Sequence, residues 1–128
     1  MAAARTFEDL LAWQQARKLV AAVRVAIKTE HLSRDYPLSD QMLRAARSTM
    51  ANIAEGFESG SRPEFNRYLG MARSSCAELR SHLYEAEDAK ILESNMQEQL
   101  ATLAKSTSNL VSSLKIAVEK KIPKARKA

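Results

Sequence analysis

Apolar positions along the chain recur every three or four residues, which is the spacing of one face of an α-helix. Four such segments, separated by short polar or proline-containing stretches, predict helices at about residues 7–30, 39–58, 62–89 and 95–119. The three prolines, at positions 37, 63 and 123, stand at the predicted boundaries and leave the helix interiors intact. Because helices joined by short connections must run antiparallel, the pattern predicts an all-α, up-down-up-down four-helix bundle.

The clearest helix start lies at Ser61. Glu64 follows three residues later, and Pro63 stands in the first turn, which is the signature of a capping box. Apolar or small residues then recur at heptad spacing, at Phe65, Leu69, Ala72, Cys76, Leu79, Leu83 and Ala86. This third helix is therefore expected to pack against neighbours along its whole length.

The first two helices are less sharply defined. Thr6 with Asp9 can cap the first helix, and its core stripe is Ala16, Val20, Val23 and Ile27, flanked by Leu19 and Ala26. Residues 31–37 are expected to form a loop, because Pro37 disfavours helical geometry at Tyr36. The core positions expected in the second helix are Leu43, Ala46, Met50, Ile53 and Phe57.

The fourth helix carries the second heptad pattern. Ser94, with Gln97 three residues later, is expected to cap it, and Pro123 ends it. The expected core positions are Met96, Leu100, Leu103, Thr107, Leu110, Leu114 and Ala117.

Charge divides the chain into a neutral body and a basic tail. The 128 residues carry a net charge of +5, yet residues 1–119 hold 15 basic and 15 acidic groups. The excess belongs to residues 120–128, with Lys120, Lys121, Lys124, Arg126 and Lys127. We therefore expect one bundle domain, 1–119, followed by a short basic tail.

A single cysteine, Cys76, cannot form an internal disulfide, and this favours a cytoplasmic protein. Its heptad position predicts a buried packing residue rather than a reactive thiol. Residues 1–5 lack the apolar segment of a signal peptide, and the longest apolar run, Leu19–Val23, is far too short to cross a membrane.

No set of residues predicts catalysis, a metal site or a cofactor. The two histidines, His31 and His82, are far apart in sequence, and no glycine-rich phosphate loop is present. The best carboxylate group, Glu85 with Glu87 and Asp88, has no Glu-x-x-His partner of the di-iron bundle type. We expect these carboxylates to be a solvated surface and the protein not to be an enzyme.

A polar stripe follows the second helix at spacings of three and four residues: Gln41, Arg44, Ser48, Asn52 and Glu55. One interpretation is a solvent-exposed face. The other is a hydrogen-bonding surface between protomers, in which the guanidinium of Arg44 pairs with a carboxylate such as Glu55 or Glu78.

Residues 7–86 resemble a known family. The strongest elements are the run Asn52–Gly56 followed by Ser61, Glu64-Phe65, Tyr68-Leu69, Ala72, Ser75 and Glu78-Leu79. They are similar to the signature of the four-helix-bundle proteins encoded in intervening sequences of bacterial large-subunit (23S) ribosomal RNA genes. The resemblance implies a homopentameric ring. It also covers the polar stripe, Ser75 and Glu78, and so favours the protomer-interface interpretation.

Relatives in that family include the accessory protein of diversity-generating retroelements, which binds a reverse transcriptase and its nucleic acid. Two basic groups are candidates for phosphate contacts: the tail, and Arg17, Lys18, Arg24 and Lys28 on the first helix. The tail can equally be a solubilising terminus. Since the aromatic residues are expected mostly on core faces, any binding should follow backbone charge rather than base identity.

These observations predict a non-catalytic, homo-oligomeric accessory protein that associates with RNA or DNA, with a reverse transcriptase or another protein as a further partner. The alternative is a protein-interaction scaffold that does not bind nucleic acid.

Overall fold

The computed structural model of the protein describes residues 3–123, and within that range the regular structure is helical throughout. The elements are the 3₁₀ helix η1 (Phe7–Asp9), α1 (Leu11–Ala26), α2 (Glu30–Arg34), α3 (Tyr36–Glu58), α4 (Arg62–Asp88) and α5 (Ser94–Lys120). None of the helices in the described range is long and apolar enough to span a bilayer.

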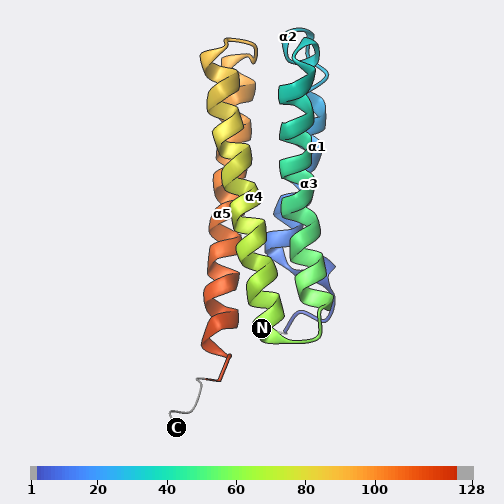
Figure 1. The fold of residues 1–128 in the computed structure, drawn as a ribbon, viewed down its shortest axis with the longest axis vertical. Coiled ribbons are helices and arrows are strands. Elements are labelled where there is room, and N and C mark those ends of the chain that lie inside the picture. The colour runs from blue at the N-terminus through green and yellow to red at the C-terminus, as the bar shows by residue number, and fades with distance from the viewer. Residues whose placement is uncertain (1–2, 124–128) are drawn as a thin grey trace.

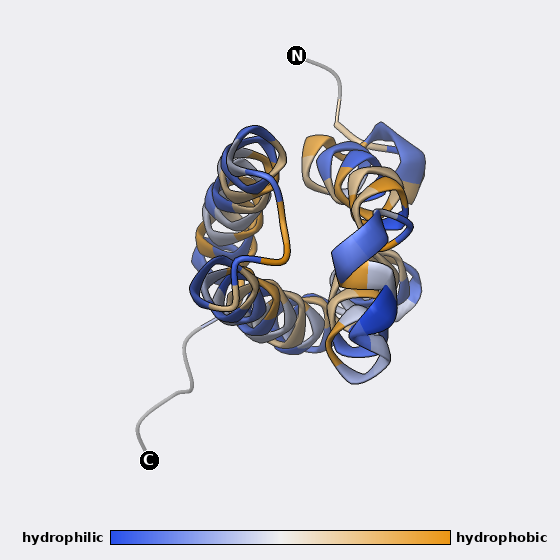
Figure 2. Ribbon diagram, turned by 90° about the horizontal axis from the view of Figure 1, so that it is seen from above, coloured by the Kyte–Doolittle hydropathy of each residue, from blue (hydrophilic) through white to orange (hydrophobic). Residues whose placement is uncertain are grey.

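The four long helices, α1, α3, α4 and α5, alternate in direction and form a single bundle, with α2 at the end where α1 connects to α3 (Figure 1). Neighbouring pairs are α1 with α3, α3 with α4, α4 with α5, and α5 with α1. Seen from above, the helices surround a common interior, and each helix carries both hydrophobic and hydrophilic residues (Figure 2). The predicted all-α bundle is confirmed.

The first helix is shorter than predicted. Asp9 accepts hydrogen bonds from the backbone N–H groups of Arg5 (3.0 Å) and Thr6 (3.1 Å), and these bonds lower the pKa of its carboxyl. That arrangement caps η1, and α1 begins only at Leu11. At the other end, the Thr29 hydroxyl donates to the Ala26 carbonyl at 2.6 Å, and the chain leaves helical geometry at Thr29. The predicted continuous helix over 7–30 is therefore wrong.

The loop predicted over residues 31–37 is also wrong. Residues Glu30–Arg34 form α2, and α3 already starts at Tyr36 instead of Ser39. The Asp35 carboxylate caps α3 by accepting from Leu38 N at 3.2 Å. Pro37 is tolerated because it stands in the first turn, where its missing N–H has no intrahelical acceptor.

The turn between α3 and α4 follows the local signals closely. Gly60 adopts φ +86°, a left-handed conformation that glycine reaches without strain. Ser61 Oγ then accepts from Glu64 N at 3.3 Å, so Ser61 caps α4 as predicted. The Glu64 carboxylate turns to Arg67, at 2.9 Å, rather than back to Ser61, so only half of the capping box is formed.

The predicted core of α4 is confirmed, since its heptad positions from Leu69 to Ala86 are all buried. Phe65 at the start of the pattern is half-buried. In α3 only Ala46 and Ile53 of the predicted core positions are fully buried, because the buried face is rotated toward α4. That face also includes Met42, Ala45, Thr49, Asn52 and Gly56.

The register predicted for α5 is partly wrong. Ala117 is exposed, while Ala104, Val111 and Val118 are buried and were not predicted. The N-terminal cap is wrong as well, because Ser94 is the first helical residue and Glu93 precedes it without a side-chain capping bond. The buried residues of α5 are Gln97, Leu100, Ala104, Thr107, Val111 and Val118.

Candidate nucleic-acid interface

The basic residues predicted on the first helix are all exposed, but they do not form one line. Arg17 and Arg24 lie two turns apart on one side of α1, whereas Lys18 is rotated by about 100° from Arg17. Lys28 lies beyond the end of α1, in the turn before α2. The Arg17 guanidinium lies 5.7 Å from the centre of the Trp13 ring, a cation–π arrangement that holds it near the helix surface.

The predicted basic tail begins inside α5. Lys120 is the last residue of that helix and Lys121 follows it, and both are exposed. Lys124, Arg126 and Lys127 lie outside the described residues. The C-terminal end of α5 is at the same end of the bundle as the α3–α4 turn (Figure 1). Lys120 and Lys121 are therefore remote from α2 and from Lys28.

The polar stripe on α3 consists of a buried part and an exposed part. Asn52, 7% exposed, donates through Nδ2 to the Ser48 carbonyl (2.8 Å) and to Ser48 Oγ (3.1 Å). Ser48 Oγ in turn shares a hydrogen bond of 2.9 Å with Ser75 Oγ of α4. These three residues thus connect α3 with α4 within the chain.

The other members of the stripe, Gln41, Arg44 and Glu55, are exposed. Arg44 makes no ion pair with any of the residues that the structure describes. Glu78 on α4 is also exposed and lies 3.5 Å from Nε2 of His82 instead. Among the described residues, the Arg44 guanidinium therefore has no carboxylate partner.

The chemistry of Cys76 is that of a core residue. The side chain is fully buried, and its thiol donates to the Ala104 carbonyl of α5 at 3.2 Å. Burial raises the pKa of this thiol, which disfavours the reactive thiolate. The prediction of a buried packing residue is confirmed. Within residues 3–123, no three His, Cys, Asp or Glu side chains are grouped to hold a metal ion.

Two surface grooves were not predicted, and both are lined by the first turns of α5. One, of about 880 Å³, lies between α4 and α5 and includes Arg80, Tyr84 and Gln97. The other, of about 670 Å³, lies between α1 and α5 beside Val25, which is 61% exposed. Sequence patterns give little indication of such sites, because each groove is shared by two helices.

We expected the aromatic residues mostly on core faces, and two of them are exceptions. Tyr84 is 66% exposed and Tyr36 is 74% exposed. Helical periodicity could have predicted that Tyr84 is exposed, since Tyr84 falls outside the heptad positions of α4.

Comparison with known protein families identifies a matching family. The family model described as 23S rRNA-intervening sequence protein matches residues 8–113. The matched segment includes the whole of α1 to α4, the polar stripe and both grooves, and it stops before Lys120 and Lys121. No curated protein matches the chain.

Proposed function

The chain belongs to the 23S rRNA-intervening sequence protein family, and on that premise we propose that it is a non-catalytic accessory protein that forms a homopentameric ring and associates with RNA or DNA. The family match is the observation that carries the proposal. Charge distribution supports the nucleic-acid part. The exposed polar side chains on α3, among which Arg44 has no ion pair within residues 3–123, support the ring.

Assembly would employ the exposed part of the stripe. Arg44 lies one helical turn before Ser48 and Glu55 three residues after Asn52, so both exposed side chains lie on the side of α3 that carries these hydrogen bonds. An arginine guanidinium binds a carboxylate most strongly when the carboxylate accepts two parallel hydrogen bonds from it. A neighbouring protomer, presenting Glu55 or Glu78, supplies such an acceptor. The pentameric number comes from the family resemblance.

Light scattering on the purified protein tests the ring, and should give a mass near five times 14.3 kDa. If Arg44 is buried between protomers, Arg44→Ala strands a carboxylate and costs about 3–5 kcal/mol, which dissociates the ring. Arg17→Ala is the matched control, because Arg17 is exposed and lies over Trp13. A monomer at micromolar concentration, or equal small effects of the two variants, would contradict the ring.

Nucleic-acid association would rest on charge. The body, residues 1–119, is neutral, so the tail supplies most of the long-range attraction to a polyanion. One short tail binds weakly, but a ring brings several tails to one end of the assembly. Binding driven by counterion release strengthens steeply with the number of phosphates neutralised.

Titration of single-stranded RNA and DNA at low and moderate salt, with full-length protein and a variant lacking residues 120–128, tests this part. We expect the truncated protein to keep its fold and mass, bind more weakly, and show a flatter dependence on salt. If the full-length protein has no affinity even at low salt, the nucleic-acid proposal is wrong.

The second candidate is a protein-interaction scaffold. The groove between α1 and α5, with Val25 exposed above it, is the observation that favours it. A reverse transcriptase is the partner suggested by the family's retroelement relatives. Co-purification from cells, followed by identification of bound RNA and bound protein, separates the two candidates. Salt-resistant binding of a protein without RNA would favour the scaffold.

A further inference from the structure

The groove between α4 and α5 combines an apolar floor with an exposed aromatic ring. It lies near the hairpin that joins the two helices, has a volume of about 880 Å³, and has Leu83, Leu92 and Ala101 among its lining residues. Tyr84 belongs to the lining and is 66% exposed. An aromatic ring that remains in solvent beside apolar surface provides a face on which another flat ring can stack.

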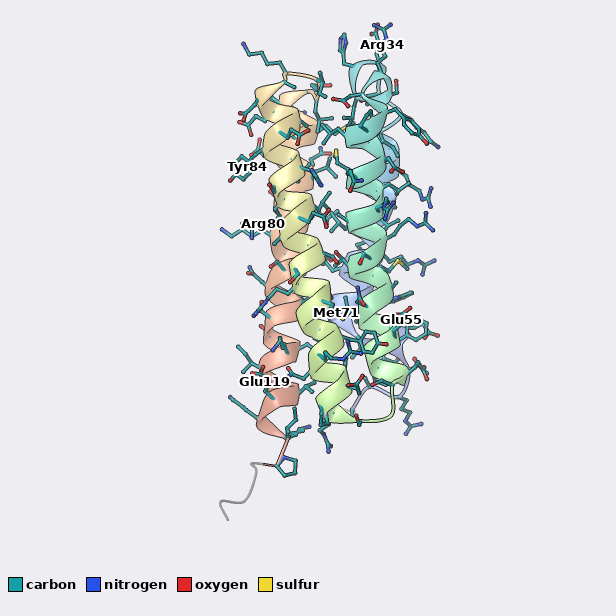
Figure 3. All side chains as sticks on the ribbon, viewed as in Figure 1. Arg34, Glu55, Met71, Arg80, Tyr84 and Glu119 are labelled. Atoms are coloured by element: carbon teal, nitrogen blue, oxygen red, sulfur yellow. The ribbon has the colours of Figure 1, made fainter. Side chains whose placement is uncertain are left out.

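Cations flank this ring at one end of the groove. Arg80 lies one helical turn before Tyr84, and both side chains project from α4 on the side away from α3 (Figure 3). Lys105 lines the same groove from α5. Because α4 and α5 are antiparallel, Arg80 and Lys105 both lie at the end of the groove farther from the hairpin.

Gln97 carries a hydrogen-bond acceptor that has no donor among the described residues. The residue is 9% exposed, and its Nε2 donates to the Leu83 carbonyl at 2.6 Å, which fixes the orientation of the amide. Its Oε1 is buried and has no hydrogen-bond partner among the described residues. A buried acceptor left unpaired is costly, so this oxygen favours a ligand that carries an N–H donor.

The remaining charges define the polarity of the groove. Glu87, Glu93 and Glu98 line the part nearer the hairpin, where Lys90 is the accompanying cation. A phosphate is thus repelled from the hairpin end and attracted to Arg80 and Lys105. Carboxylates at the other end accept hydrogen bonds from amino groups. A ligand with an anion at one end, a flat ring in the middle and N–H donors at the other matches this arrangement.

We propose that this groove binds one nucleotide of a single-stranded nucleic acid. The base stacks on Tyr84 with its polar edge toward Gln97 Oε1, and the phosphate lies between Arg80 and Lys105. The inference rests on the proposed nucleic-acid function and deepens it, because it adds a contact to the base where charge alone gives contacts only to the backbone.

Fluorescence anisotropy of a labelled oligoadenylate of about six nucleotides, titrated with full-length protein at low salt, measures the contact. Tyr84→Ala should weaken binding about tenfold, the usual scale for loss of one stacked base. Tyr84→Phe should restore most of the affinity, because it keeps the ring. Tyr36→Ala is the matched control, since Tyr36 is 74% exposed and lies outside this groove, and it should bind as the unmodified protein does.

A strand of the same length without bases separates stacking from charge. The unmodified protein should bind the abasic strand with about the affinity that Tyr84→Ala has for the oligoadenylate, and Tyr84→Ala should lose little more on it. Gln97→Met removes the acceptor together with the bond to the Leu83 carbonyl, so it should lower the melting temperature as well as weaken oligoadenylate binding. At a temperature where the variant is folded, it should bind the abasic strand as the unmodified protein does, which distinguishes a contact to the base from a purely structural amide. Arg80→Ala should reduce the salt dependence by about one released ion.

Equal binding by Tyr84→Ala and Tyr36→Ala, or equal affinity for the strands with and without bases, would contradict the proposed nucleotide site. Neither result would contradict binding through the phosphate backbone. If the full-length protein binds neither strand, the proposed function fails together with the groove. Circular dichroism of each variant establishes that the fold is kept, so that a loss of binding is assigned to the groove.

Discussion

The two ends of the bundle are built differently. At the α3–α4 turn, which we call the closed end, Gly56 allows the helices to approach closely, since a Cβ there would lie 2.7 Å from Tyr68 Cβ. Phe57 and Phe65 meet edge to face across the turn, with their ring centres 5.9 Å apart. At the opposite, open end, beside α2 and the α4–α5 hairpin, the first turns of α5 line two grooves.

The difference comes from side-chain size and polarity. A glycine opposite aromatic residues allows two helices to pack without a gap. The first turns of α5 instead carry long polar side chains such as Glu98 and Gln99, which remain exposed because burial against an apolar neighbour would cost them hydrogen bonds to water. The closed end therefore provides stability, and the open end provides surface that a ligand can use.

The largest expected effect tests whether the core near the open end excludes solvent. Cys76 belongs to the core cluster that continues to Leu92 at that end. Because the thiol is buried, thiol labelling of the native protein should be slower than that of the unfolded protein by at least about 100-fold. Rapid stoichiometric labelling in native buffer would show that this half of the core opens readily.

Gly56→Ala tests the closed end. The added methyl group meets Tyr68 Cβ, which cannot rotate away, so the helices must separate. We expect a loss of about 1–3 kcal/mol in the free energy of unfolding, measured by denaturant titration. Gly70→Ala is the matched control, because its Cβ would lie 3.5 Å from Lys115 Cε, an ordinary contact. It should be neutral or stabilising by up to about 1 kcal/mol. Equal effects would mean that α3 and α4 are not closely packed at Gly56.

Asn52→Ala tests the hydrogen bonds that join α3 to α4 between the two ends of the bundle. It removes the donor to Ser48 and should cost about 1 kcal/mol in the free energy of unfolding. Combining it with Ser75→Ala should give less than the sum of the two single losses, because both residues bond to Ser48. Strict additivity would show that the three side chains do not act as a network.

The smallest expected effect concerns the ion pair between Lys115 and Glu119 on α5 (Figure 3 labels Glu119). Its hydrogen bond lowers the pKa of the Glu119 carboxyl, whose ordinary value is 4.5. A depressed carboxyl pKa stabilises the fold above that value, and the contribution is lost as pH falls below it. Glu119→Gln should slightly reduce the acid dependence of the melting temperature, and adding Lys115→Met should change it no further. A large effect would mean that this pair, whose carboxylate is exposed, contributes more to stability than a surface ion pair usually does.

Local signals determined α4 almost completely. The turn at Gly60, the cap at Ser61 and the heptad positions to Ala86 involve residues that are near one another in sequence, and the structure agrees with each. The same holds for the burial of Cys76 and for the presence of four long helices, although not for the ends of the first helix or the start of the second. Such features follow from backbone geometry and helical periodicity, which the sequence states directly.

Features that depend on a distant partner were missed. The short helix α2 has no strong local signal, and it is held by the burial of Leu32, whose carbonyl accepts from Ser39 Oγ at 2.6 Å. A helix of five residues is not stable by itself, so only packing could reveal it. In α5, apolar and small residues occupy more than one stripe, and contact with both α1 and α4 selected Val111 and Val118 over Ala117.

The sequence by itself determined the bundle, the charge of the tail and the position of the polar stripe. Only the tertiary structure decided that the stripe divides into a buried and an exposed part. It also brought Arg80 and Tyr84 of α4 together with Gln97 and Lys105 of α5. The physical reason is that periodicity fixes which side of a helix is buried, whereas a site shared by two helices depends on their rotation and separation, which are set by packing.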